Sequence, residues 1–187
     1  MNIKIDYLSI PLIALMALTR VHHFGSAFTL PDASLAVFFL AGLGFSSPYL
    51  LGFLLLEAGL IDYIAINQFQ VSDWCISPAY IFLIPTYAVL WFAGRYCSRF
   101  KVLNVSELTT SLILLGLATS VAFGISNGSF YLFSGRYADV AFGQYATSVM
   151  QYYLPYMTSA LVYGLLGLVL IKIFKSLPVL VNHQKEV

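Results

Sequence analysis

Long apolar runs alternate with short polar breaks along almost the whole chain. The breaks contain residues that end helices or form turns, among them Pro31, Gly44 and Asn127. A helix needs about 20 mostly apolar residues to cross the hydrocarbon core of a bilayer. By that measure the pattern predicts an all-α protein with six membrane-spanning helices, over residues 7–20, 32–44, 48–66, 78–96, 106–127 and 152–174.

The second apolar run is shorter than a full crossing. Asp32 follows Pro31 and suits the N-cap of a helix that begins there. The run ends at Gly44, and Pro48 soon opens the third run. We therefore interpret the second run either as a half-helix or as part of a kinked unit with the third.

Composition supports a membrane protein with a single domain over residues 1–187. The chain is 60% hydrophobic and 9% charged, with a mean hydropathy of +0.86, whereas soluble domains carry about 25% charged residues. No polar linker or internal repeat divides it. The net charge of +1 gives no sign of the basic surface that nucleic-acid binding requires.

The basic residues predict the orientation in the membrane. With six spans both termini lie on one side, and Arg20 and Arg136 lie on the other. The remaining seven of the nine basic residues share the side of the termini: Lys4, Arg95, Arg99, Lys101, Lys172, Lys175 and Lys185. Because Lys and Arg accumulate in cytoplasmic loops, both termini are predicted to be cytoplasmic. The outer segments are then residues 21–31, 67–77 and 127–147.

Two cysteines lie on opposite sides of the membrane in this topology. Cys75 falls in the second outer segment and Cys97 at the cytoplasmic end of the fourth span. The helix between them is on the order of 30 Å long, whereas a disulfide needs Cα atoms within about 7 Å, so they cannot pair. Cys75 is then either a small residue buried under Trp74 or a thiolate ligand for a soft or borderline metal.

Other candidate binding residues lie near the same outer face. His22 and His23 are adjacent, and neighbouring helical residues point about 100° apart, so at most one is expected to serve as a ligand or donor. Asp62, about one turn below the outer surface, is expected to accept hydrogen bonds from a ligand or to orient a partner such as His23. Glu57 lies deeper, and we expect it to form a structural hydrogen bond to a neighbouring helix.

The third outer segment is rich in aromatic residues and includes Tyr131 and Arg136. Many of these rings fit the aromatic belt found at membrane interfaces. Their density also suits a lid over a large flat ligand, on which rings and a planar guanidinium stack. The chain contains no phosphate-binding loop, serine–histidine–acid triad or zinc signature. The sequence therefore indicates a binding site more than a catalytic one.

Three runs resemble the cobalamin-specific S components of energy-coupling-factor vitamin transporters from proteobacteria. They are RVHHFGSA at 20–27, LPDASLAVFFLAG at 30–42 and WCISPAY at 74–80. The resemblance covers most of the chain. It implies an S-component bundle of six helices in the bacterial inner membrane, with cobalamin as the ligand. It also implies Cys75 as the cobalt ligand, flanked by Asp62 and Tyr80.

An energy-coupling module, made of a membrane scaffold and ATPases, is the partner that this resemblance implies. Many S components carry an Ala-x-x-x-Ala patch on the first span for docking the scaffold. Here the nearest pair, Ala14 and Ala17, is spaced by three. The chain therefore departs from the family pattern at this point, and docking to a standard coupling module does not follow from it.

The leading hypothesis is a vitamin-uptake protein that binds cobalamin from the outer side through a cysteine thiolate. The predicted site consists of a cobalt ligand and five substrate-binding residues: Cys75, His23, Asp62, Tyr80, Tyr131 and Arg136. A thiolate on cobalt would also displace an upper ligand such as cyanide, a conceivable side activity. Two alternatives remain: a membrane thiol or redox enzyme, which would normally need a second cysteine nearby, and an S component for another vitamin.

Overall fold

A computed structural model describes residues 9–21, 30–44, 47–69, 71–100 and 104–176. Within these ranges the chain forms helices and connecting turns, and no strand. The all-helical prediction is confirmed for this part of the chain. The elements are α1 (Ser9–Thr19), α2 (Ser34–Gly44), α3 (Pro48–Phe69), the 3-10 helices η1 (Asp73–Cys75) and η2 (Pro78–Phe82), α4 (Leu83–Cys97), α5 (Val105–Phe133), α6 (Phe142–Met150) and α7 (Tyr153–Ser176).

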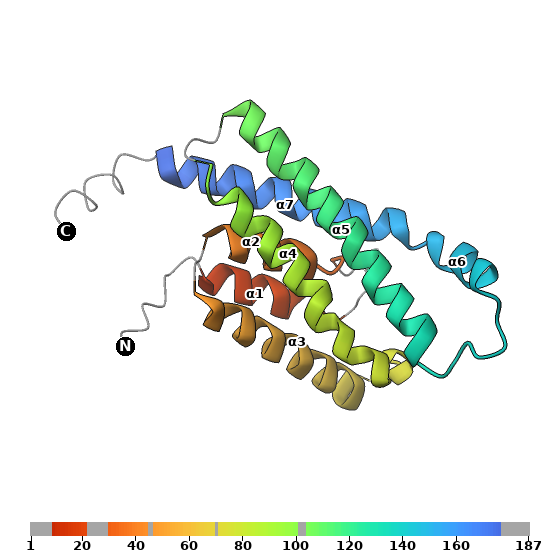
Figure 1. Cartoon of the computed structure of the whole chain (residues 1–187). Coiled ribbons are helices and arrows are strands. Elements are labelled where there is room, and N and C mark those ends of the chain that lie inside the picture. Colours follow the sequence, from red (N-terminus) through yellow and green to blue (C-terminus); the bar gives the residue numbers. More distant parts are fainter. Residues whose placement is uncertain (1–8, 22–29, 45–46, 70, 101–103, 177–187) are drawn as a thin grey trace.

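The longer helices pack side by side with alternating direction (Figure 1). The start of α1 and the end of α7 lie at one end of the bundle. The short helix α6, the end of α5 and the start of α4 lie at the opposite end, which we call the α6 end (Figure 1). The described residues of the second and third predicted outer segments, 67–69, 71–77 and 127–147, lie at this α6 end.

In the part of the chain that the structure describes, three helices are long and apolar enough to cross a membrane: α3, α5 and α7. Two shorter apolar helices, α1 and α2, accompany them, with 11 residues each. The helix α4 has 15 residues and is preceded directly by η2. By length and composition the chain is therefore a membrane protein, because its helices expose apolar side chains to their surroundings.

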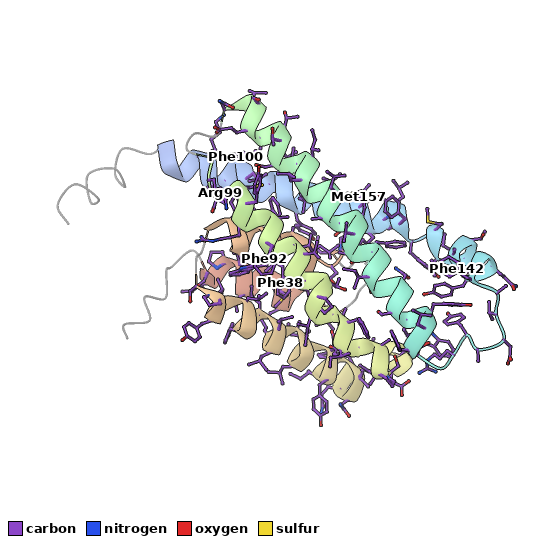
Figure 2. The ribbon with its side chains drawn as sticks, viewed as in Figure 1. Phe38, Phe92, Arg99, Phe100, Phe142 and Met157 are labelled. Carbon is purple, nitrogen blue, oxygen red and sulfur yellow. The ribbon has the colours of Figure 1, made fainter. Side chains whose placement is uncertain are left out.

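The core is built around α2. Every residue from Ser34 to Gly42 is buried, as expected for a helix that is apolar all round. Its most extensive contact is with α4, where Phe38 stacks on Tyr87 with ring centres 4.2 Å apart and lies among the helices (Figure 2). The short second run is thus a separate central helix, enclosed by its neighbours.

The helices around the third predicted outer segment differ from the sequence-based prediction. The helix α5 continues to Phe133, well past the predicted end near Asn127, and α6 forms within the predicted outer segment. The polar residues there are accommodated in the helix, because Asn127 Nδ2 donates to the Phe123 carbonyl at 3.0 Å and Ser129 Oγ donates to the Ser126 carbonyl at 2.9 Å. The chain turns only around Gly135, whose φ of 71° favours glycine.

The start of α2 also differs by two residues. The helix begins at Ser34, and the Asp32 side chain lies just ahead of it. Asp32 Oδ1 accepts from the Ser34 backbone nitrogen at 2.9 Å and from Ser34 Oγ at 2.6 Å. Asp32 therefore supports the helix start from outside its first turn, close to the predicted capping role.

Candidate functional site

A buried arginine at the end of α1 is the centre of the polar site. Arg20 follows Thr19 and is 2% exposed. Its Nε donates to Asp62 Oδ1 at 2.8 Å and its Nη2 donates to Asp62 Oδ2 at 2.7 Å. This two-pronged pairing of guanidinium with carboxylate is strong and fixes the orientation of both groups.

Arg20 also contacts two further helices, α2 and α4, through Nη1. Its Nη1 donates to Ser34 Oγ at 3.0 Å and to the Tyr87 hydroxyl at 2.5 Å. Nη1 also lies 3.7 Å from Asp32 Oδ2, and Nε lies 3.3 Å from the Ala58 carbonyl oxygen. A buried charge needs such compensation from opposite charges and hydrogen bonds. We call this group the Arg20 cluster; its members are Arg20, Asp32, Ser34, Asp62, Tyr80 and Tyr87.

The helix pattern explains why Asp62 faces this cluster. In α3 the buried positions are Leu54, Ala58, Asp62 and Ala65, which recur at the spacing of one helix face. Asp62 was predicted to accept hydrogen bonds from a ligand or to orient His23. In the structure it accepts from Arg20 and from Tyr80, whose hydroxyl lies 2.6 Å from Oδ2. His23 lies outside the described residues.

Tyr80 connects the cluster to the segment that carries Cys75. Cys75 ends η1, and Tyr80 lies in η2, five positions later. The backbone between them is tightly turned: the Ile76 nitrogen donates to the Asp73 carbonyl at 2.8 Å and the Tyr80 nitrogen donates to the Ser77 carbonyl at 2.9 Å. The side chain of Cys75 is outside what the structure describes, so its predicted metal ligation is not tested.

Cys97 lies at the far end of α4, away from η1 and η2. It is the last residue of that helix and is 1% exposed. The helix places it at the end of the bundle opposite the α6 end (Figure 1). This position matches the prediction that the two cysteines lie too far apart to pair.

Aromatic rings gather around the end of α5 and α6. The rings of Tyr131 and Tyr145 lie 5.0 Å apart, and those of Tyr137 and Tyr145 lie 4.6 Å apart. The Tyr131 hydroxyl donates to the Val140 carbonyl at 2.8 Å, which fixes the connection after α5. Figure 2 shows Phe142 in this region. We call the group the aromatic cluster; it contains Phe130, Tyr131, Tyr137, Phe142 and Tyr145.

Arg136, in the connection between α5 and α6, contacts the residue next to Cys75. Its guanidinium carbon lies 4.1 Å from the centre of the Trp74 ring, a cation–π contact. Phe133 at the end of α5 stacks on Phe82 of η2 with ring centres 5.0 Å apart. The structure therefore places Arg136 next to the residue that precedes Cys75. It places Tyr131 against its aromatic neighbours, at the same end of the bundle.

Two apolar grooves lie away from these contacts. One, of about 610 Å³, runs between α3 and α4 and reaches Tyr80 and Tyr87. The hydroxyls of both tyrosines are bonded to Asp62 and Arg20, so the groove itself offers mainly apolar surface. The other, of about 470 Å³, lies between α5 and α7. Neither groove includes residues of η1 or of the aromatic cluster.

Glu57 behaves differently from Asp62. One of its carboxylate oxygens, Oε2, is buried and has no hydrogen-bond partner among the described residues. The structural hydrogen bond expected for Glu57 is therefore not made by this oxygen. An ionisable group in an apolar helix without such a partner is costly.

The described residues contain no group of three or more His, Cys, Asp or Glu side chains that could hold a metal ion. A metal ion held by protein side chains alone would need such a group. Cobalt held in a corrin ring has its in-plane positions filled by ring nitrogens, and a protein would supply an axial ligand only. The finding therefore leaves the predicted Cys75–cobalt contact untested.

The most connected residue of the site, Arg20, has no binding role in the sequence-based prediction, which places it at the outer end of the first span. The prediction gives no binding role to Asp32, Ser34 or Tyr87 either. One signal was available, because Arg20 and Asp62 carry opposite charges. Arg20 lies at the end of one apolar run, and Asp62 lies within another. Because charged side chains are almost never fully buried unless paired, such residues are candidates for each other.

Comparison with known proteins adds no assignment. No protein-family model matches the chain, and no curated protein matches it. The resemblance to cobalamin-specific S components accordingly stays a prediction.

Proposed function

We propose that the protein is a vitamin-uptake protein of the bacterial inner membrane that crosses the bilayer six times. The alternating helix directions support this topology, with α1, α2 and the η2–α4 pair completing the three longer helices. Of the two basic residues predicted outside, Arg20 is buried and ion-paired. Arg136 alone then remains as a loop charge on that side, which strengthens the argument for cytoplasmic termini.

The ligand that we propose is cobalamin, bound from the outer side at the α6 end. Cobalamin is broad and flat, carries amides around its rim, and contains a cobalt ion that accepts an axial ligand. The Cys75 thiolate would supply that ligand, since thiolates suit soft and borderline metals. Tyr131 and Arg136 would cover the ring, and Tyr80, Asp62 and His23 would line the polar side of the site.

One observation carries this proposal: the segment that contains Cys75 is anchored on both sides. Trp74 lies beneath the Arg136 guanidinium at 4.1 Å, and Tyr80 is bonded to the buried Asp62 at 2.6 Å. A residue that ligates a metal must be held in place by its neighbours. The contacts from α3 and from the segment after α5 therefore support a role in which Cys75 is held in a fixed position.

An energy-coupling module remains the proposed partner for transport. Ala14 and Ala17 are both exposed on α1, beside Leu18, which is 79% exposed. These residues form an apolar surface with small side chains at its centre. Such a surface suits helix packing within a membrane, although its spacing differs from that of the family patch.

A spectral titration with cobalamin tests the function. Purified wild type should change the cobalt absorption spectrum on binding, because a thiolate replaces the upper ligand. Cys75→Ser should lose that change and bind more weakly, since a hydroxyl is a poor substitute for a thiolate on this metal. Cys97→Ser is the matched control, and it should behave as wild type because Cys97 lies at the opposite end.

An identical spectrum for Cys75→Ser and wild type would show that the thiol is not a cobalt ligand. Absence of any cobalamin binding by folded wild type would remove the assignment altogether. A yellow protein on purification would instead indicate a flavin as the ligand.

A further inference from the structure

We propose that Arg20 is a positioning residue for the segment that contains Cys75. This segment runs from η1 to η2, residues 73–82, and we call it the Cys75 segment. Arg20 acts by orienting Asp62, which in turn holds Tyr80 and with it the short turn that leads back to Cys75. This inference deepens the proposed function and rests on it for the identity of the ligand. The link from Arg20 to the Cys75 segment can be tested without cobalamin.

The Asp62 carboxylate contacts both Arg20 and Tyr80. Both of its oxygens are bonded to Arg20, and Oδ2 also accepts the Tyr80 hydroxyl. The Asp62 side chain is 8% exposed. The Arg20 guanidinium therefore sets the orientation of the Asp62 carboxylate. Through its bond to Tyr80, this carboxylate in turn contacts the proposed binding site at the α6 end.

The charged partner of Asp62 is an arginine rather than a lysine. Nε and Nη2 contact the two oxygens of one carboxylate while Nη1 contacts Ser34 and Tyr87. A planar guanidinium can make these contacts together, whereas the ammonium of lysine is a point charge with no such fork. The guanidinium thus fixes α3 relative to α2 and α4 at the place where Tyr80 docks.

The path along the chain from Tyr80 to Cys75 is short. Ser77, Pro78 and Tyr80 form a tight turn with a 2.9 Å hydrogen bond from the Tyr80 nitrogen to the Ser77 carbonyl. Pro78 fixes its own φ, so the backbone has little freedom between the anchor and the cysteine. Loss of the Tyr80 anchor should therefore change the position of Cys75.

The variants must separate positioning from simple stabilisation of the bundle. Removing one charge alone would leave the other buried and unpaired, which is strongly destabilising, whereas replacing both by apolar residues is often tolerated. The double variant Arg20→Met/Asp62→Leu removes the pair. Tyr80→Phe removes only the hydroxyl that contacts Asp62. All variants carry Cys97→Ser, so that Cys75 is the only cysteine.

The matched control is Tyr153→Phe. Its hydroxyl lies 2.8 Å from Ser120 Oγ, between α5 and α7. Like Tyr80→Phe, this substitution removes one tyrosine hydroxyl from an interhelical contact. The contact lies outside the Arg20 cluster, η1 and η2. A general loss of packing would affect this variant as well.

The first readout is the rate at which a water-soluble maleimide modifies Cys75 in the absence of cobalamin. Tyr80→Phe and the double variant should change this rate in the same direction, and combining them should add little. The second readout is affinity for cobalamin with its spectral change, which should weaken by about tenfold or more, the usual effect of losing a hydrogen bond to a charged group. Tyr153→Phe should match the parent in both readouts.

A changed maleimide rate in both variants supports the positioning role, whether or not the parent protein shows a cobalamin spectrum. Absence of that spectrum in the parent protein would overturn the proposed function alone. An unchanged rate and unchanged affinity in both folded variants would overturn the positioning role. If the double variant does not fold, Arg20→Lys takes its place, since it keeps the charge but loses the fork. An unchanged rate in Arg20→Lys and Tyr80→Phe would equally refute the inference.

Discussion

Replacement of Gly94 by alanine should disrupt the central contact of the bundle. Gly94 lies in α4, where α4 packs most extensively against α2. A Cβ at this position would lie 2.9 Å from the Leu43 backbone nitrogen and still closer to the Phe39 carbonyl oxygen. Both atoms belong to the α2 backbone, so no side-chain rotation can relieve the contact.

The magnitude follows from that geometry. Non-bonded heavy atoms rest at about 3.5 Å or more, so relieving the contact with the Phe39 carbonyl oxygen would require α2 and α4 to separate by more than about 1 Å. Inserting a methyl group into a packed core costs about 1–3 kcal/mol, and the rigid partner places this case at the upper end. At 187 residues a loss of about 3 kcal/mol lowers the melting temperature by about 6–12 °C.

The separation should also reach the polar site. Ser34 begins α2 and Tyr87 lies in α4, and both hold Arg20. Thermal unfolding of detergent-purified protein is the measurement, with cobalamin affinity as a second readout. Gly124→Ala in α5 is the control, because nothing lies within 4 Å of its Cβ. It should melt at or above the wild-type temperature, since alanine favours helix. If Gly94→Ala melts with wild type, the close approach of α2 and α4 is wrong.

Two further predictions address topology and the aromatic segment. Reporter fusions should place residue 101 in the cytoplasm; a fusion that reports it outside would refute the six-span topology with cytoplasmic termini. Arg136→Ala should weaken cobalamin binding about two- to fivefold with normal folded yield, because it removes the 4.1 Å contact to Trp74. Arg99→Ala is the control, since the Arg99 guanidinium lies over Tyr96 at the opposite end of the bundle. Equal affinities of both variants for cobalamin would reduce the Arg136 contact to surface packing.

The existence of the helices was readable from the sequence because lipid-facing and buried positions are both apolar. Each of the six predicted runs corresponds to a helix, with η2 and α4 together matching one. The end of α5 was not predicted correctly, because Asn127, Gly128 and Ser129 resemble a turn. Inside a helix, asparagine and serine can instead bond to carbonyls of the preceding turn.

The contacts of the site were harder to predict for a related reason. In α2 nearly every residue is apolar, so the periodicity that identifies a buried face is absent. Nothing in the run 34–42 shows which side meets α4 or where Ser34 points. Asp62 could be recognised as a functional candidate from its place in an apolar run, but its partner depends on how α1 and α3 pack. His23 and the Cys75 side chain lie outside the described structure.

Contacts beside the Arg20 cluster also satisfy backbone groups around the end of α1 and the start of α2. The last carbonyls of α1 and the first amides of α2 lack partners within their own helices, and burying them without partners is costly. Thr19 Oγ1 accepts from the Ala33 nitrogen at 3.1 Å, and Ser159 of α7 donates to the Asp32 carbonyl at 2.6 Å. Irregular backbone at membrane depth is tolerated only where protein or a water-lined cavity satisfies it.

The charges complete this arrangement. A cation is favoured at the C-terminal end of a helix and an anion at the N-terminal end. Arg20 follows α1 and Asp32 precedes α2, and their side chains lie 3.7 Å apart. Each charge therefore interacts favourably with a helix end and with the other charge. Because Asp62 and Tyr80 join the same group, the residues that let α1 and α2 end inside the bundle also anchor the segment that carries Cys75.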